Sequence, residues 1–577
     1  MPEPANHYFE VEMNLRNVAG LTNLKKNGYI DLKMPVWTPG SYLIREYAKN
    51  VEAFRATANG QPVPTEKIRK NTWRISTQTD DITVRYRVYA YELTVRTSFL
   101  DDVHGYVNGA SMFLFHDALK DQPARLVVQP AKGWNKVSVA LKPVAGASFT
   151  YEVPNFDLLV DSPMEIGTHR TFTFMASGVP HTVAQFGDMD YNEPQLAADY
   201  KRVCETATSI FGEHPCTDYT FIVHHTNVGG GGLEHQNSTS LQTTRNVYSV
   251  QPTNTAYKGF MTLVAHEYFH LWNVKRLRPI ALGPFDYENE NYTRALWEAE
   301  GFTSFYEDYI LRMAGFHTPE QYMNVVLGDI NGIENQPGNR VQSVADASFD
   351  AWIKYYRPNE NSSNSTISYY NKGSVLASLL NLSIINSTNG EKTLSDVMRL
   401  LYNRYYKELK RGFRDEELKA ALEQVGGKNL DDFFRKYVYG TDAIDYNAFF
   451  EPVGLRLMNA NANSNDVYLG VATGMNPTNG RQTIMSIRRG SAAEVAGLNV
   501  GDELLALDSV RVTDDVNKLV TTYKPGSTFR MLISRGGIVR ELPVTLTKLP
   551  LVAYRFEALP NQTEKQKALY AKWLVIK

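Results

Sequence analysis

The sequence predicts a multidomain α+β protein, and three observations lead to this expectation. The chain has 577 residues, more than one hydrophobic core usually supports. Roughly its first 170 residues alternate apolar and polar side chains with the period of half-buried strands. Residues 257 to 439 follow a mostly helical pattern, and a shorter β-rich stretch comes after them.

The N-terminal strands are predicted from two alternating segments. In "FEVEMNL" and "ITVRYRVYAYE" every second residue is apolar, which is typical of a strand with one buried face. Asn59-Gly60 predicts a two-residue hairpin turn, because both residues tolerate a positive φ. Residues 1–172 are therefore expected to form a β-sandwich.

The middle of the chain is predicted to be mostly helical. Residues 194–212 begin with proline and end with glycine, as helices often do, and the strand "YTFIVHH" and a run of four glycines follow. Residues 173–455 are expected to form this domain, and residues 467–548 a small β-rich one. The tail, 549–577, should contain a short helix that opens with a capping box of Thr563 and Gln566.

Composition and charge exclude several classes of protein. The net charge is −2 and no long basic run occurs, so nucleic acid is not an expected partner. The longest apolar stretch, 374–385, is well short of the ~20 residues that cross a bilayer, so no membrane partner is expected. The first residues lack a signal-peptide pattern, which predicts a cytoplasmic location; a mature periplasmic or secreted chain that has lost its leader would look the same. Cys204 and Cys216 are the only two cysteines, and the sequence does not decide whether they form a disulfide.

Residues 264–279, "VAHEYFHLWNVKRLRP", carry a motif that indicates chemistry. His266 and His270 are four residues apart, so on a helix both imidazoles lie on one face and can bind one metal ion. Glu267 would then accept a proton from the attacking water. A hydrolytic zinc site takes three protein ligands, so a third ligand is required. The alternative is a structural helix with two ordinary histidines.

A second helical stretch offers candidates for the third ligand. "TRALWEAEGFTSFYEDYILRM" is amphipathic and contains Glu298, Glu300 and Glu307. Any of the three satisfies the spacing, and all three could instead be solvated charges on a helix surface.

Two of these segments resemble a known group of enzymes. "HEYFH" followed by "LWEAEGFTSFYED" resembles the gluzincin metallopeptidases, in which a glutamate just before Gly-Phe binds the metal; this resemblance selects Glu300. The 29 residues between His270 and Glu300, and "WTPGSYLIREYAKN" near the N-terminus, are similar to the glycyl aminopeptidase family, M61. The resemblance implies a thermolysin-like catalytic domain, peptide substrates and one Zn²⁺ per chain, held by His266, His270 and Glu300.

The oxyanion of peptide hydrolysis needs a second donor beside the metal. Tyr370-Asn371-Lys372-Gly373 is similar to the Tyr-x-Lys-Gly segment that carries the catalytic tyrosine in aminopeptidases of this clan. The resemblance implies that Tyr370 is this donor, and the neighbouring Tyr369 is the alternative.

The segment "VGGGGLEHQNS" resembles the Gly-x-Met-Glu-Asn element of aminopeptidases. The resemblance implies that Gly231 and Gly232 bind substrate through their backbone and that Glu234 binds its N-terminal amine. The similarity to the M61 family implies a preference for small N-terminal residues such as Gly or Ala. Leu233 and His235 depart from the pattern, which weakens the case for N-terminal selectivity. The glycines could instead form a hairpin turn, and His235 is expected to support the site from outside it.

The C-terminal unit suggests a competing function. "SIRRGSAAEVAGLNVGDELLALDSVRV" looks like part of a PDZ domain, which implies binding of a peptide or a protein tail. "YLGV" departs from the usual carboxylate loop, so a purely structural module is an equal alternative. The rival functions are a peptide-binding protein with an inactive peptidase body and an endopeptidase on the same fold. The complete set of expected catalytic and metal-binding residues favours an active aminopeptidase.

Overall fold

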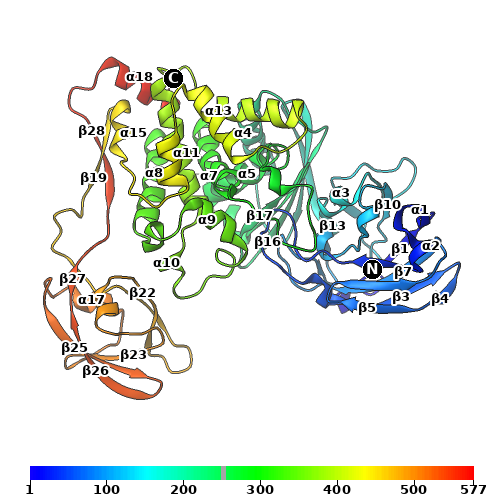
Figure 1. Ribbon diagram of the computed structural model, residues 1–577, viewed down its shortest axis with the longest axis horizontal. Coiled ribbons are helices and arrows are strands. Elements are labelled where there is room, and N and C mark those ends of the chain that lie inside the picture. The colour runs from blue at the N-terminus through cyan, green and yellow to red at the C-terminus, as the bar shows by residue number, and fades with distance from the viewer. Residues whose placement is uncertain (249–254, 577) are drawn as a thin grey trace. The chain divides into compact units, whose positions relative to one another are not determined.

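The computed structural model describes residues 1–248 and 255–576 and separates the chain into two compact units. The first unit contains residues 1–293, 306–317 and 397–418, and the second contains residues 294–305, 318–396 and 419–577. This grouping does not test the predicted division after residues 172, 455 and 548, which stays a prediction. Figure 1 labels many of the helices and strands of both units.

The first 168 residues are rich in β-structure, as predicted. One sheet has the order β1-β7-β3-β4, with β1 (Tyr8–Leu15), β3 (Val51–Ala58), β4 (Gln61–Val63) and β7 (Ile82–Tyr89). Its strands β1 and β7 are the two segments predicted from alternation, and they pair antiparallel along their whole length. Asn59 and Gly60 have φ values of 49° and 77° and join β3 to β4, so the predicted hairpin turn is confirmed.

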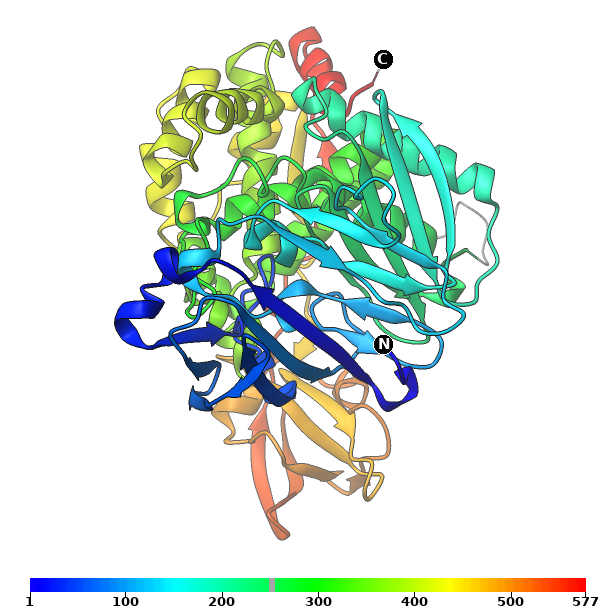
Figure 2. The ribbon, with the colours of Figure 1, turned by 90° about the vertical axis from the view of Figure 1, so that its right-hand side faces the viewer.

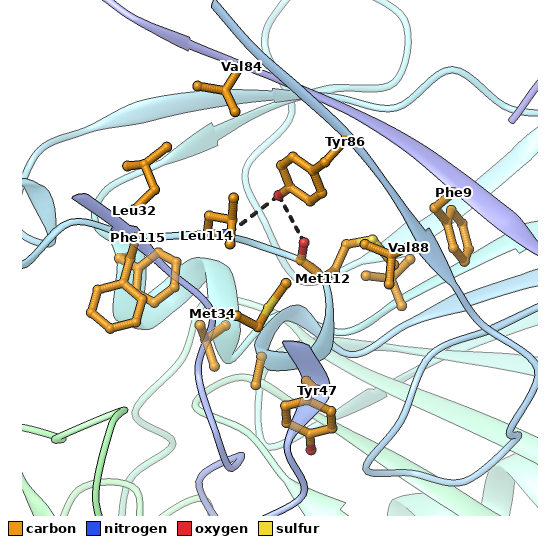
Figure 3. Packing of buried hydrophobic residues seen from close by; sticks show 14 of the residues in the cluster. Phe9, Leu32, Met34, Tyr47, Val84, Tyr86, Val88, Met112, Leu114 and Phe115 are labelled. Atoms are coloured by element: carbon orange, nitrogen blue, oxygen red, sulfur yellow. Dashed lines mark hydrogen bonds between the residues drawn. The ribbon is translucent and has the colours of Figure 1, made fainter. Parts of the chain in front are cut away.

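Three further sheets complete this β-rich region. Their strands are β2 (Tyr29–Lys33), β5 (Thr65–Arg69) and β6 (Thr72–Ser76); β8 (Phe99–Leu100), β9 (Gly105–Val107), β11 (Lys136–Val139) and β13 (Met164–Gly167); and β10 (Ala124–Val127) with β12 (Thr150–Val153). Figure 3 shows part of the apolar core, where the Tyr86 hydroxyl donates to the Met112 carbonyl at 3.0 Å and accepts from the Leu114 N–H at 3.3 Å. Short helices α1 (Ala19–Thr22), α2 (Leu24–Asn27) and α3 (Phe156–Val160) lie in the connections.

A five-stranded sheet in the first unit carries the predicted glycine-rich segment. Its order is β14-β15-β16-β18-β17, with β14 (Arg170–Ala176), β15 (Val179–Phe186), β16 (Tyr219–Thr226), β17 (Gly231–Glu234) and β18 (Ser238–Thr244). Figure 2 shows these strands side by side. Strand β17 is antiparallel to β18 and is an edge strand of this sheet. The glycines therefore enter an edge strand rather than only a turn.

Helices α4 (Glu193–Phe211) and α5 (Thr255–Phe269) pack together, and α5 also packs against β17 and β18. Helix α4 has Asn192 as its N-cap and Gly212, at φ 81°, after its last residue, which confirms the helix predicted there. Helix α5 ends one residue before His270, and the His270 N–H still donates to the His266 carbonyl at 3.2 Å. The two histidines thus occupy the last helical turn beside the edge strand.

The second unit is mostly helical before residue 450. Its helices are α6 (Leu296–Ala299), the first part of α7 (Gly301–Met313), α8 (Pro319–Glu334), α9 (Val344–Phe349), α10 (Ser362–Ser365), α11 (Tyr369–Ser387), α14 (Asp431–Phe433) and α15 (Asn447–Phe450), with parts of α12 (Leu394–Leu401) and α13 (Asp415–Gly426). Helix α11 is buried along most of its length and packs against α6, α8 and α9. A Cβ on Gly301 would lie 2.5 Å from the Gly373 Cα, so glycines allow the start of α7 to approach α11 closely.

The C-terminal part of the second unit is a β-rich module with its own apolar core. Its elements are β20 (Val467–Tyr468), β21 (Val471–Met475), β22 (Gln482–Ile487), β23 (Glu503–Leu507), β24 (Val510–Arg511), β25 (Thr528–Arg535), β26 (Ile538–Thr545), β27 (Thr547–Lys548), α16 (Ala492–Val495) and α17 (Val516–Val520). Gly497 and Gly501 have φ values of 77° and 88°, as turns between helix and strand require. The module is thus mixed and β-rich, while its membership of the PDZ class is not confirmed.

The tail contains more structure than the predicted short helix. Strand β28 (Tyr554–Ala558) pairs antiparallel with β19 (Leu455–Asn459). One strand of this two-stranded ribbon comes before the module in the sequence, and the other comes after it (Figure 1). Helix α18 (Glu564–Trp573) begins with the predicted capping box and buries Trp573. Cys204 and Cys216 are free thiols. None of the helices in the described ranges combines the length and the apolar character needed to cross a membrane.

Candidate active site

The two histidines of the motif present one ring nitrogen each to a common point. Their Nε2 atoms are 3.1 Å apart. The Nδ1 atom of His270 donates to the Asn273 carbonyl at 2.6 Å, and the Nδ1 atom of His266 is hydrogen-bonded to the Glu307 carboxylate. These bonds place the protons on Nδ1 and leave the Nε2 lone pairs facing each other.

This arrangement fits a bound metal cation. Two lone pairs at 3.1 Å repel each other unless a positive charge lies between them. Imidazole rings that bind a metal usually donate their second N–H to a carbonyl or a carboxylate, and both rings here do so. The residues present therefore suit a divalent ion, and two imidazoles joined by a carboxylate are a donor set that favours zinc.

Glu267 and Glu234 bring two buried carboxylates beside this point. One ligand-type atom each of Glu234, Glu267 and His270 lies within 4.8 Å of the other two. Both glutamates are only 4% exposed. Buried carboxylates placed together repel each other unless cations join them, so this arrangement suits a metal ion and a substrate ammonium group.

Gly232 makes room for the Glu267 side chain. A Cβ on Gly232 would lie 2.2 Å from Glu267 Oε1 and 2.3 Å from its Cδ. Only a residue without a side chain allows the carboxylate to rest against the strand in this way. The sequence predicted that the backbone of Gly232 allows a ligand to approach closely. The structure shows that the missing side chain also leaves space for Glu267.

Gly40 makes room for the Glu234 side chain in a similar way, although the sequence assigned no role to Gly40. A Cβ on Gly40 would lie 2.5 Å and 2.7 Å from the two Glu234 carboxylate oxygens, and Gly40 has a φ of 86°. Gly40 belongs to "WTPGSY", and Trp37 fixes this loop by donating its indole N–H to the Asp286 carbonyl at 2.7 Å. A pocket of about 180 Å³ lies beside Glu234 and is also lined by Trp37, Tyr42 and Arg278.

His235 supports the end of the edge strand. Its Nδ1 atom donates to Asp161 Oδ1 at 3.0 Å, and Lys275 donates to the same oxygen at 2.8 Å. Burial alone would raise the pKa of Asp161, but Lys275 and His235 outweigh it and lower that pKa. The ring of His235 is thus engaged in an ionic cluster, in agreement with the supporting role expected for it.

In the second unit, Glu300 and Tyr370 interact electrostatically. Glu300 follows α6 and is 2% exposed, and Tyr370 lies in the first turn of α11. Burial raises the pKa of Tyr370 well above its ordinary value, and the charge of Glu300 raises it further. The Tyr370 hydroxyl is 3.4 Å from that of Tyr356, and the ring of Tyr369 stacks on Tyr370.

A second group of ligand-type residues lies apart from the motif. His104 Nδ1 and His224 Nε2 donate to the two oxygens of Glu165 at 2.8 Å and 2.9 Å. Burial would raise the pKa of Glu165, but the two histidines lower it to about 2. The remaining ring nitrogens are buried without a partner in the described residues, unlike those of metal-bound histidines. This group is better explained as a buried ionic network that joins β13 to β16.

Comparisons with known proteins support the assignment of a peptidase. The family description "Peptidase M61 N-terminal domain" matches residues 1–168, and "M61 glycyl aminopeptidase" matches residues 259–376. A solved aminopeptidase N family protein from Idiomarina loihiensis is similar at 30% identity and a TM-score of 0.90, over 99% of this chain and 98% of that one. An M1 zinc metallopeptidase from Deinococcus radiodurans is similar at 12% identity and a TM-score of 0.47, over 77% and 92%. The search of curated proteins gave no match.

These matches define the class of the protein as metallo-aminopeptidase. The chain belongs to the M61 glycyl aminopeptidase family. The expected resemblance is therefore confirmed.

Proposed function

We propose that the chain is a zinc-dependent aminopeptidase that removes small N-terminal residues, Gly or Ala, from peptides. The observation that carries this proposal is the grouping of Glu234, Glu267 and His270 around one point. An aminopeptidase needs a proton acceptor for water and an anion for the substrate ammonium group, and two buried carboxylates beside a histidine supply both.

In this proposal His266, His270 and Glu300 hold one Zn²⁺, which supplies Lewis-acid polarisation of the scissile carbonyl. Helix geometry supports Glu300 as the third ligand. The backbone of Glu300 is helical and its carbonyl accepts from the Ser304 N–H, so Glu300 continues α7 by one residue. Glu300 and Glu307 are then two turns apart on one helix face, and Glu307 is bonded to His266.

The chain's own residues perform the remaining steps of the proposal. Glu267 accepts a proton from the attacking water and passes it to the departing amine. The Tyr370 hydroxyl donates a hydrogen bond to the oxyanion, for which its raised pKa keeps it protonated. Glu234 binds the substrate ammonium group, and Gly231 and Gly232 offer the backbone of an edge strand to the peptide.

The test measures zinc content together with release of glycine from Gly-Ala, with and without chelator. We expect about one zinc per chain, chelator-sensitive release, and little cleavage of N-acetyl-Gly-Ala. Glu267→Gln should abolish release, while Glu205→Gln, on the exposed side of α4, serves as a control and should leave it intact. Cleavage of acetylated peptides at the same rate would favour an endopeptidase, and undiminished activity of the Glu267 variant would refute the mechanism.

We also propose that residues 467–548 form a PDZ-type module. Its antiparallel sheet, its two short helices and the turn at Gly470, with a φ of 87°, support this assignment. Strand β21 is an edge strand of the sheet, and α17 lies against it through a bond from Asn517 to the Val471 carbonyl at 3.0 Å. Fluorescence anisotropy with a library of peptides bearing free C-termini tests whether the module binds such tails, and uniform lack of binding would favour a structural role.

A further inference from the structure

Arg96 lies in a rigid segment next to the substrate-binding edge strand. Its backbone is fixed at both ends, because its N–H donates to Thr94 Oγ1 at 3.1 Å and its carbonyl accepts from the Tyr47 hydroxyl at 2.7 Å. Its guanidinium group donates to the Gly232 carbonyl at 3.4 Å and lies 3.8 Å from where a Cβ on Gly231 would be. The side chain is therefore aimed at the two glycines of β17.

The bond to Gly232 places Arg96 on the outer side of the strand. In a strand, the N–H and C=O of one residue project to the same side, and successive residues alternate. The Leu233 carbonyl points toward β18, where it accepts from Thr239 Oγ1 at 2.9 Å. The Gly232 carbonyl therefore points outward, to the side on which an added peptide strand would pair.

The guanidinium group has most of its hydrogen-bonding capacity unused. It has five N–H donors, and the Gly232 carbonyl takes one of them. Across residues 1–248 and 255–576 no carboxylate forms an ion pair with Arg96, and its Nε is buried without an acceptor. A half-buried guanidinium group of this kind is suited to a bidentate bond with a carboxylate that arrives from solution.

The spacing along β17 indicates which carboxylate this is. A strand advances about 3.3 Å per residue, so Gly232 and Gly231 lie about 7 and 10 Å along the strand from Glu234. An extended dipeptide or tripeptide spans about 6 to 10 Å between its ammonium group and its terminal carboxylate. With the ammonium group at Glu234, the carboxylate of such a peptide reaches the position that Arg96 faces.

We propose that Arg96 binds the C-terminal carboxylate of dipeptides and tripeptides, and that it makes the enzyme selective for short peptides with a free C-terminus. This inference rests on the proposed function, because it takes the substrate to run along the outer edge of β17 from Glu234. Arg96 acts here as a specificity-determining residue, since it contacts a group of the substrate that takes no part in the bond cleavage.

The test compares kcat/KM for Gly-Ala, Gly-Ala amide and a Gly-Ala-initiated octapeptide with the zinc-loaded enzyme. A charge-assisted bond of this kind is worth a preference of about 30-fold for the free acid over the amide, which corresponds to about 2 kcal/mol. Arg96→Gln should reduce the ratio to about 1, mainly through loss of activity on the acid. Arg96→Lys keeps the charge without the planar fork and should give an intermediate ratio.

The control is Arg85→Gln, which removes an exposed guanidinium group of β7 that pairs with Glu12 and should leave the wild-type ratio unchanged. A wild-type ratio near 1 would overturn the proposal without any variant. Equal losses on acid and amide in the Arg96 variants would also overturn it, because they would assign Arg96 only the role of holding the strand.

Failure of the proposed function is distinguished by a binding measurement. If the wild-type enzyme cleaves none of these peptides, the proposed function fails, and calorimetry on zinc-loaded Glu267→Gln protein still measures binding of Gly-Ala and its amide. Tighter binding of the acid that is lost on adding Arg96→Gln supports the role of Arg96, and equal binding of acid and amide overturns it.

Discussion

Replacing Gly232 by alanine is expected to disable catalysis while leaving the fold intact. The new Cβ would lie 2.2 Å from Glu267 Oε1, 2.3 Å from its Cδ and 2.4 Å from its Cγ. The backbone of Gly232 is extended and its φ is negative, so alanine fits the strand without backbone strain. The strand itself gains stability, because alanine loses less conformational entropy on folding than glycine.

The expected magnitude follows from the distance by which Glu267 must move. Reaching an ordinary contact of 3.4 Å from 2.2 Å requires a shift of about 1.2 Å. Misplacing a catalytic group by about 1 Å typically costs about 100-fold in rate. We therefore expect kcat on Gly-Ala to fall about 100-fold, with zinc content unchanged and the melting temperature within a few degrees of wild type.

The assay combines steady-state kinetics with thermal unfolding of the zinc-loaded protein. Gly230→Ala is a matched control, because a Cβ there meets only the Gln242 carbonyl, at 4.0 Å. That variant should keep wild-type kcat. If the Gly232 variant kept more than a third of wild-type kcat with an unchanged melting temperature, Glu267 would not act from the position seen in the structure.

Three further predictions concern two residues of the site and the buried network around Glu165. Glu307→Gln should weaken zinc binding about 10- to 100-fold in chelator competition, because the amide orients His266 less firmly than the carboxylate does. Tyr370→Phe should lower kcat about 100-fold with little change in KM for Gly-Ala, and an equal rise in KM would refute its role as an oxyanion donor. Glu165→Gln should lower the free energy of unfolding by about 3 kcal/mol at pH 7 in urea titrations. Because the folded-state pKa of Glu165 is depressed to about 2, this difference should persist above pH 4.5 and shrink as the pH falls toward 2.

Local patterns predicted the local structure well. The alternation that identified β1 and β7, the positive-φ pair Asn59-Gly60 and the caps of α4 and α18 depend on neighbours in sequence, and the structure has each of them. Strand β28 was missed because it is a short segment whose partner, β19, lies about a hundred residues earlier. The residues next to β28 in the sequence give no indication that it pairs with β19.

The same distinction separates the predicted site residues from the missed ones. The sequence pairs the two histidines because they are four residues apart on one helix, and a helix period is a local property. The contact of Gly40 with Glu234 joins residues that are far apart in the chain, and the contact of Arg96 with Gly232 does likewise. Single glycines and arginines are common in any sequence, so only the fold reveals that these two face functional groups.

The sequence spacing allows any of three glutamates to be the third metal ligand, and their surroundings in the structure differ. Glu307 hydrogen-bonds the Nδ1 atom of His266, and a carboxylate that orients a ligand from its outer nitrogen does not also bind the metal at Nε2. Glu298 lies two residues before Glu300, which on a helix turns its side chain by about 200° to the opposite face. Glu300 lies on the same helix face as Glu307 and raises the pKa of Tyr370 through its charge. These positions support the proposal that Glu300, rather than Glu298 or Glu307, is the third zinc ligand.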